Sequence, residues 1–149
     1  MNITDELLVE LLSESKDAAT FSYSPYSNYR VGAAVATDAG HFKGANIENA
    51  SSNLGICAER AAIAAARTQG ARNIYAIAVY CLDATIDNSG NIADVRETLP
   101  CGACRQWLAE LAPDAVVITN GLVKPLSVSE LLPSAFRLPN MADLTRRCS

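Results

Sequence analysis

Residues 57–82, CAERAAIAAARTQGARNIYAIAVYCL, contain the clearest change of secondary structure in the chain. The alanine-rich half, Cys57 to Gln69, predicts a helix that ends at Gly70, because glycine commonly follows the last helical turn. The second half, Ile74 to Leu82, is an apolar run of strand length. A helix followed closely by a buried strand indicates an α/β protein.

The segments before residue 57 predict one more helix and a β-hairpin. Thr4 is a good N-cap for a helix that runs to about Ala18, with acidic residues in its first turn. Two strands, Tyr29–Thr37 and His41–Ile47, flank a short turn that contains a glycine. The intervening stretch, residues 21–27, is a loop that is unusually rich in aromatic residues.

The segments after residue 82 continue the alternation. Residues 83–100 form the longest connection, and they are followed by a helix over Gly102–Leu111, a buried strand over Ala115–Thr119 and a short helix over Ser127–Leu132. We therefore expect a single domain, residues 1–149, with three α/β/α layers and a mixed sheet of about five strands. The pattern does not determine the strand order.

Composition narrows the possible functions. The chain has 149 residues, 50% of them hydrophobic and 19% charged, and a net charge of -4. No apolar run reaches the ~18–20 residues of a membrane span, and the first residues lack a basic leader, so we expect a cytoplasmic protein without a membrane partner. The acidic balance disfavours a nucleic acid partner and favours a small-molecule substrate.

The cysteines point to metal or redox chemistry. There are five, Cys57, Cys81, Cys101, Cys104 and Cys148, and only one histidine, His41. An odd number without an export signal argues against a disulfide framework. We expect Cys81 to be a small core residue, Cys148 a free surface thiol and His41 an exposed residue at the hairpin turn.

Two fragments carry the candidate chemistry: Cys57-Ala58-Glu59-Arg60 and Pro100-Cys101-Gly102-Ala103-Cys104-Arg105-Gln106. Each opens a predicted helix, where the helix dipole favours a thiolate. Three converging thiolates would form an open zinc site with a fourth position for water. Glu59 could then move the protons of that water, and Arg60 could offset the negative charge of the thiolates.

Other interpretations of these residues remain open at this point. Cys101 and Cys104 alone could form a redox dithiol, and a closed structural zinc site would need a fourth ligand. Glu59 and Arg60 could be ordinary charges on the surface of a helix.

The zinc fragments, together with further segments, resemble the small cytidine deaminases of the all-cysteine zinc branch. The further segments are Tyr23–Ser27, Val31–Ala34, Gly44–Ala50 and Leu131–Phe136. The resemblance implies one Zn²⁺ per chain on Cys57, Cys101 and Cys104, and proton transfer by Glu59. It also implies a homotetramer with shared active sites, in which Phe136 is donated across a subunit interface.

The resemblance implies substrate contacts as well. Asn46 and Glu48 match positions that bind ribose hydroxyls, the Ala58 N–H matches the donor to the pyrimidine carbonyl, and the Leu99 carbonyl matches the acceptor of the amino group. Tyr29 replaces the usual phenylalanine that stacks on the base. Two further departures, Ser52 for a tyrosine and Arg137 for a glycine, leave the substrate range open.

The predicted function is therefore hydrolytic deamination of cytidine and 2′-deoxycytidine, with release of ammonia, in pyrimidine salvage. The nearest alternative is a deaminase of a modified cytosine nucleoside, such as a blasticidin-type antibiotic. An alternative of another class is a zinc or thiol module that serves protein interaction without catalysis.

Overall fold

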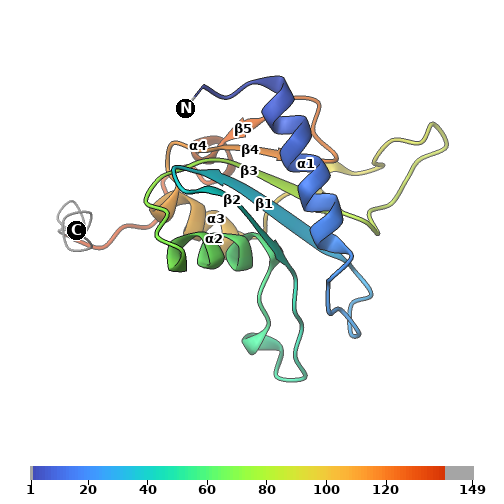
Figure 1. Cartoon of the computed structure of the whole chain (residues 1–149). Helices are drawn as coiled ribbons and strands as arrows, with labels where there is room; N and C mark the ends of the chain where they lie inside the picture. Colours follow the sequence, from blue (N-terminus) through green and yellow to red (C-terminus); the bar gives the residue numbers. More distant parts are fainter. Residues whose placement is uncertain (1, 140–149) are drawn as a thin grey trace.

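The computed structural model describes residues 2–139, so Cys148 lies outside the described residues. Its elements are α1 (Asp5–Ala19), β1 (Val31–Thr37), β2 (Gly40–Ala45), η1 (Ser52–Leu54), α2 (Ala58–Thr68), β3 (Ile74–Cys81), η2 (Val95–Glu97), α3 (Gly102–Leu111), β4 (Val116–Thr119), β5 (Leu126–Ser127) and α4 (Val128–Leu131). Helix α1 covers one face of the sheet, and α2 and α3 cover the other (Figure 1). The predicted α/β/α arrangement is confirmed.

The sheet is mixed and has five strands in the order β2-β1-β3-β4-β5. Strand β1 pairs antiparallel with β2 and with β3, β3 pairs parallel with β4, and β4 pairs antiparallel with β5. The sequence pattern missed β5, because a strand of two residues shows no periodicity. Ser127, the expected start of a helix, ends β5 and also caps α4 in a capping box with Glu130.

The two faces of the sheet carry side chains of different size. Alanines of β1 and β3, such as Ala34 and Ala78, face α1, whereas larger residues such as Val35 and Ile77 pack toward α2 and α3. On the α1 face, a Cβ added to Gly32 would lie 1.9 Å from the carbonyl oxygen of Ser15. Small side chains therefore allow α1 to lie directly on the sheet.

A second glycine brings α2 against β2. A Cβ added to Gly44 would lie 2.4 Å from the Ala62 nitrogen and 2.6 Å from the Ala58 oxygen. Side chains do not separate the two backbones at this point, so the first turn of α2 is fixed relative to the hairpin. That turn carries Cys57 and Glu59.

Two loops extend from the same end of the sheet and run side by side. Figure 1 shows residues 20–30 and 46–57 projecting together, and isolated bridges join Tyr23 to Ile47 and Ile47 to Ile56. Residue 57 follows directly and opens α2. The two loops therefore border the helix start that carries the first candidate ligand.

One expectation about a single residue was wrong. His41 is only partly exposed, and its Nδ1 lies 3.1 Å from Oε2 of Glu14 on α1. Phe136, which the resemblance assigns to a subunit interface, leaves 69% of its surface exposed. Cys81 is buried in β3, as expected.

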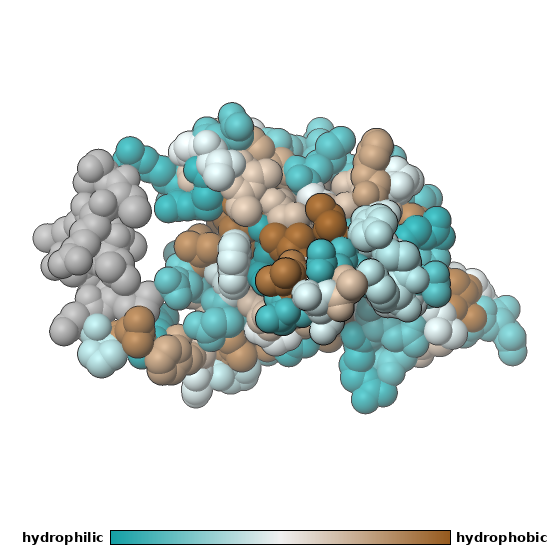
Figure 2. Space-filling view, turned by 90° about the horizontal axis from the view of Figure 1, so that it is seen from below, coloured by the Kyte–Doolittle hydropathy of each residue, from teal (hydrophilic) through white to brown (hydrophobic). Residues whose placement is uncertain are grey.

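The side of the sheet covered by α2 and α3 is shown in space-filling form in Figure 2. Hydrophobic residues gather near the centre of this face, with hydrophilic residues around them. Among residues 2–139, no helix combines the length and the apolar character that a membrane span requires.

Candidate zinc and active site

Three cysteines converge at the starts of α2 and α3. Cys57 is the N-cap of α2, Cys101 is the N-cap of α3, and Cys104 lies in the first turn of α3. The Sγ atoms of Cys57 and Cys101 are 3.7 Å apart, and those of Cys101 and Cys104 are 3.5 Å apart. All three sulfurs lie within 4.8 Å of one another. Two positive helix ends therefore face one group of thiols.

This group of sulfurs fits a zinc ion. Sulfurs bound tetrahedrally to one zinc at about 2.3 Å lie about 3.8 Å from one another, close to the separations found here. A redox dithiol would need only Cys101 and Cys104, yet the sulfur of Cys57 lies almost as close. Hydrogen bonds from Cys104 and Arg60 lower the pKa of the Cys57 thiol to about 5, so this sulfur favours the form that binds metal, whereas the hydrogen bond with Cys57 and burial raise the pKa of the Cys104 thiol.

Glu59 lies beside the cysteines and is buried. Only 4% of its surface is exposed, so Glu59 is not an ordinary charge on the surface of a helix. Burial raises the pKa of its carboxyl to about 7; the charge of Cys57 adds to this effect, whereas a hydrogen bond with Cys104 opposes it. A carboxyl with a pKa near neutrality can both accept and release a proton at physiological pH.

Arg60, the next residue of α2, also contacts the cysteine cluster. Its Nη2 donates to Cys57 Sγ at 3.8 Å, and its guanidinium lies 6.0 Å from the centre of the Trp107 ring. The Nε atom is buried and has no hydrogen-bond partner among residues 2–139. A cation held beside a ligand sulfur reduces the negative charge of a three-thiolate site.

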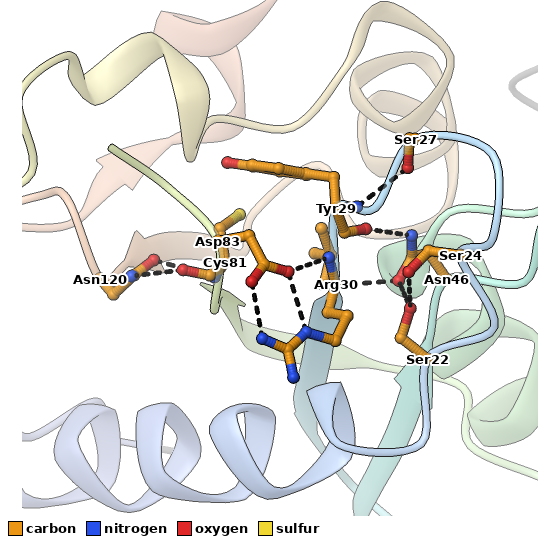
Figure 3. Close-up of polar contacts among 10 residues, drawn as sticks. Ser22, Ser24, Ser27, Tyr29, Arg30, Asn46, Cys81, Asp83 and Asn120 are labelled. Atoms are coloured by element: carbon orange, nitrogen blue, oxygen red, sulfur yellow. Dashed lines mark hydrogen bonds and ion pairs between the residues drawn. The ribbon is translucent and has the colours of Figure 1, made fainter. Parts of the chain in front are cut away.

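Asn46 directly follows β2, and its side chain makes hydrogen bonds to the backbone of the chain that leads into β1. Its Oδ1 accepts from the Val31 nitrogen at 2.9 Å and from Ser22 Oγ at 2.5 Å, and its Nδ2 donates to the Tyr29 carbonyl at 2.8 Å (Figure 3). The oxygen is fully used, and one N–H remains. Asn46 therefore fixes the backbone of Tyr29 and could offer a ligand only a donor.

Glu48 holds the neighbouring loop. Its carboxylate accepts from the backbone nitrogens of Tyr26 and Ser27 at 2.9 and 3.2 Å, and from the Ser27 hydroxyl. These bonds lower the pKa of Glu48, with the Ser27 hydroxyl as the largest cause. The side chain is therefore ionised at neutral pH and lies at the edge of the two projecting loops.

Three further predicted site residues lie around the cluster. Ala58 is the first residue of α2, where backbone N–H groups have no partner within the helix. Leu99 is partly buried and precedes Pro100, which is fully buried. The Tyr29 hydroxyl donates to the Glu97 carbonyl at 2.6 Å, and burial raises its pKa, so it stays protonated as a donor.

A comparison with protein families decides the assignment. The model for the cytidine and deoxycytidylate deaminase zinc-binding region matches residues 5–120. The chain belongs to this deaminase family. Within the family, a cytidine deaminase of Halalkalibacterium halodurans is 42% identical over an alignment of 139 positions that covers 89% of this chain and 96% of that relative.

A solved structure of the family has the same fold. The crystal structure of cytidine deaminase from Mycobacterium tuberculosis matches with a TM-score of 0.72 and 33% identity, over 91% of this chain and 100% of that chain. A blasticidin-S deaminase of Bacillus cereus is less similar, with 30% identity over 89% of this chain and 93% of that relative. The sequence resemblance to the deaminases is therefore confirmed, and zinc binding is a property of the matched region.

Phe136 and the two positions that depart from the usual deaminase pattern all lie on the surface. Ser52 is exposed in η1, and Arg137 is exposed after Phe136, whose carbonyl accepts from Gln106 Nε2 at 3.1 Å.

Sequence reasoning missed Arg105, although it directly follows Cys104. Its Nε donates to the Pro100 carbonyl at 2.7 Å, and its Nη1 donates to the Leu131 carbonyl at 2.8 Å. Arg105 thus ties the segment that leads into Cys101 to the end of α4. Its position four residues after Cys101, one helical turn, was the available signal.

Proposed function

We propose that this deaminase hydrolyses cytidine and 2′-deoxycytidine at C4 of the pyrimidine. One water is consumed, the C4–N bond is broken, and the products are the corresponding uridine nucleoside and ammonia. The observation that carries the proposal is the buried carboxyl of Glu59 beside three convergent cysteine sulfurs. A redox or interaction module would not require a buried carboxyl at this place.

One Zn²⁺ per chain is proposed, with Cys57, Cys101 and Cys104 as its ligands. When bound in such a site, zinc makes a water ionise near neutral pH and so supplies a nucleophile. The guanidinium of Arg60 offsets part of the charge of the three thiolates. The helix starts at Ala58 and Gly102 favour the thiolate forms for the same electrostatic reason.

Glu59 is proposed to carry the protons. Its carboxylate form accepts a proton from water and delivers it to N3 of the ring, and a second transfer reaches the departing amino group. The raised pKa of about 7 suits both directions of transfer, because neither form is strongly favoured at neutral pH. Burial excludes competing water and strengthens these interactions.

The remaining predicted residues position the nucleoside. In the proposed complex, the Tyr29 ring stacks on the base, the Ala58 N–H donates to the base carbonyl, and the Leu99 carbonyl accepts from the amino group. The last free N–H of Asn46 donates to a ribose oxygen, and the Glu48 carboxylate accepts from a ribose hydroxyl. The free N–H of Asn46 supports the first contact as a donor, and the ionised carboxylate of Glu48 supports the second as an acceptor.

We also propose a homotetramer with shared active sites. Phe136 is 69% exposed, and the loops near the site carry other exposed apolar side chains, Tyr23, Tyr26 and Leu54. Exposed aromatic rings beside a site are typical of surfaces that a second subunit covers. We place the protein in the cytoplasm, where cysteine thiols stay reduced, and in pyrimidine salvage, because its proposed substrates and products are pyrimidine nucleosides.

A modified cytosine nucleoside is the alternative substrate. The similarity to a blasticidin-S deaminase favours it, although that relative is less similar than the cytidine deaminases. The two substrates share the reacting ring and differ in the sugar, so the contacts of Asn46 and Glu48 separate them.

The test is turnover of cytidine, 2′-deoxycytidine, blasticidin S and free cytosine, followed by ultraviolet absorbance, with zinc measured in the same samples. We expect rapid reaction of the first two and poor reaction of cytosine. Glu59→Gln should keep zinc and lose about 10²–10⁴-fold of the activity. Near-normal turnover by Glu59→Gln would exclude this mechanism, and preferred turnover of blasticidin S would favour the alternative.

A further inference from the structure

The segment Val95–Leu99 leads into Pro100 and Cys101, and two buried threonines support it. Thr98 and Thr119 are 1% and 0% exposed, and their hydroxyl oxygens are 2.7 Å apart. Thr119 ends β4, so this contact joins the central sheet to the segment that carries the proposed acceptor of the substrate's amino group. Neither threonine belongs to the zinc cluster.

The hydrogen bonds of this pair have one direction. Thr98 Oγ1 must donate to the Val95 carbonyl at 2.9 Å, because a carbonyl only accepts. The hydrogen between the two hydroxyls therefore belongs to Thr119. Thr119 Oγ1 in turn accepts from the Gly121 nitrogen at 3.2 Å. A continuous chain thus runs from Gly121 N–H through Thr119 and Thr98 to the Val95 carbonyl.

The surroundings show why hydroxyls occupy these positions. A buried hydroxyl is costly unless it is hydrogen-bonded, and valine would fill almost the same volume. The hydrogen bonds of the Thr98 and Thr119 hydroxyls therefore serve a purpose other than filling the core. The backbone after β4 also lies close to the Thr98 hydroxyl, since a Cβ added to Gly121 would lie 2.6 Å from Thr98 Oγ1.

The same segment is attached at Glu97 as well. The Tyr29 hydroxyl donates to its carbonyl at 2.6 Å, and the Thr85 nitrogen donates to its carboxylate at 2.7 Å. Glu97 and Thr98 are thus each held by hydrogen bonds to residues distant in the sequence, immediately before Leu99. After Leu99 in the sequence, the Pro100 carbonyl accepts from Arg105 Nε. The Leu99 backbone lies between these attachments.

We propose that Thr119, acting through Thr98, is a positioning residue that fixes the Leu99 carbonyl for the amino group of the substrate. This inference rests on the proposed function, because it assigns the Leu99 carbonyl to that amino group. A group displaced by ~1 Å can lose about 100-fold in rate. Cytidine, which donates its amino hydrogens, is sensitive to the displacement. Uridine carries an oxygen at C4 and makes no such bond.

Thr119→Val is the test variant, and Thr119→Ser, which keeps the hydroxyl, is the conservative one. Thr37→Val is a matched control. Thr37 is also buried, accepts from the Ala39 nitrogen two residues ahead at 3.0 Å and donates to the Gly40 carbonyl at 2.7 Å. It lies at the other end of the sheet, paired with Ile74, whereas Thr119 pairs with Val79.

The experiment measures kcat/KM for cytidine, the inhibition constant of uridine, zinc content and melting temperature for all four proteins. We expect Thr119→Val to lose about 10-fold or more in kcat/KM, with full zinc and a uridine inhibition constant within about 2-fold of the parent value. Thr119→Ser should restore most of the activity. Thr37→Val should lower the melting temperature without changing the kinetics.

Other results overturn the inference. If Thr119→Val retains full activity, or weakens cytidine and uridine equally, or affects kinetics no more than Thr37→Val, then Thr119 supports only the fold. Failure of Thr119→Ser to restore activity would have the same meaning. Absence of cytidine turnover in the parent protein would instead refute the proposed function, so the two failures are distinct.

Discussion

Gly44→Ala is the substitution for which the structure gives the clearest expected effect on the site. The new Cβ would lie 2.4 Å from the Ala62 nitrogen and 2.6 Å from the Ala58 oxygen, whereas ordinary contacts begin near 3.4 Å. Both neighbours are backbone atoms, so no side-chain rotation relieves the clash. The first turn of α2 must therefore move away from β2 by about 1 Å.

This movement has two measurable consequences. Overpacking of this kind costs about 1–3 kcal/mol of unfolding free energy, or a fall of roughly 2–4 °C in Tm for each kcal/mol in a chain of this size. Because Cys57 and Glu59 move with the turn, we expect a loss of about 100-fold in kcat/KM for cytidine. Thermal unfolding, metal analysis and steady-state kinetics on the same preparation separate the two effects.

Gly32→Ala is the control, because it creates a clash of the same kind on the opposite face. Its Cβ would meet the Ser15 oxygen of α1 at 1.9 Å, and α1 carries no predicted site residue. It should lose stability while the kcat/KM of its folded fraction stays near the parent value. The reasoning is refuted if Gly44→Ala keeps full kcat/KM, or if both variants lose activity equally.

Three further predictions concern ligands, the sugar and acid stability. Cys57→Ala should lose its zinc while Cys81→Ser keeps it, and metal analysis of the two proteins decides whether the three convergent sulfurs are the ligands. Glu48→Ala should lower kcat/KM for cytidine by roughly 10- to 150-fold but leave the low rate on cytosine unchanged, whereas equal losses would mean that Glu48 only holds its loop. The hydrogen bond and charge of Arg30 lower the pKa of Asp83 to about 2, below the unfolded value of 3.8, so the pair stabilises the fold above about pH 4 and this contribution is lost as pH falls toward 2. Since Arg30 is half exposed, the contribution is at most about 1 kcal/mol. Asp83→Asn should therefore reduce the fall in unfolding free energy between about pH 4 and pH 2, measured by urea titration. An unchanged fall would contradict this.

Much of the fold could be predicted because the relevant signals are local. The helix starts at Cys57 and Cys101 follow from capping and composition, and the run Ile74–Cys81 follows from apolar content at strand length. The same two helix starts carried the prediction of a thiolate site. Spacing along the chain placed Cys101 and Cys104 on one helical turn and Cys57 at the start of another helix, but the approach of the two helix starts is a tertiary contact.

Other features could not be predicted from spacing. The two-residue strand β5 has no period, and its existence depends on pairing with β4. The contact between His41 and Glu14 depends on where α1 crosses β2, which the strand order determines. The exposure of Phe136 likewise follows from the path of the chain after α4, and not from the apolar character of the residue.

The sequence by itself determined the layers and the candidate residues for metal binding and proton transfer, because these depend on residue type and on the position of each residue at a helix start, whereas the meeting of the two helix starts is a tertiary contact. The tertiary structure decided which groups meet across elements: Gly44 under the start of α2, Asn46 beside Tyr29, and Thr119 beneath Thr98. Contacts of this kind join residues more than twelve positions apart. Their geometry follows from how the helices and strands pack against one another, and no local preference of the chain encodes it.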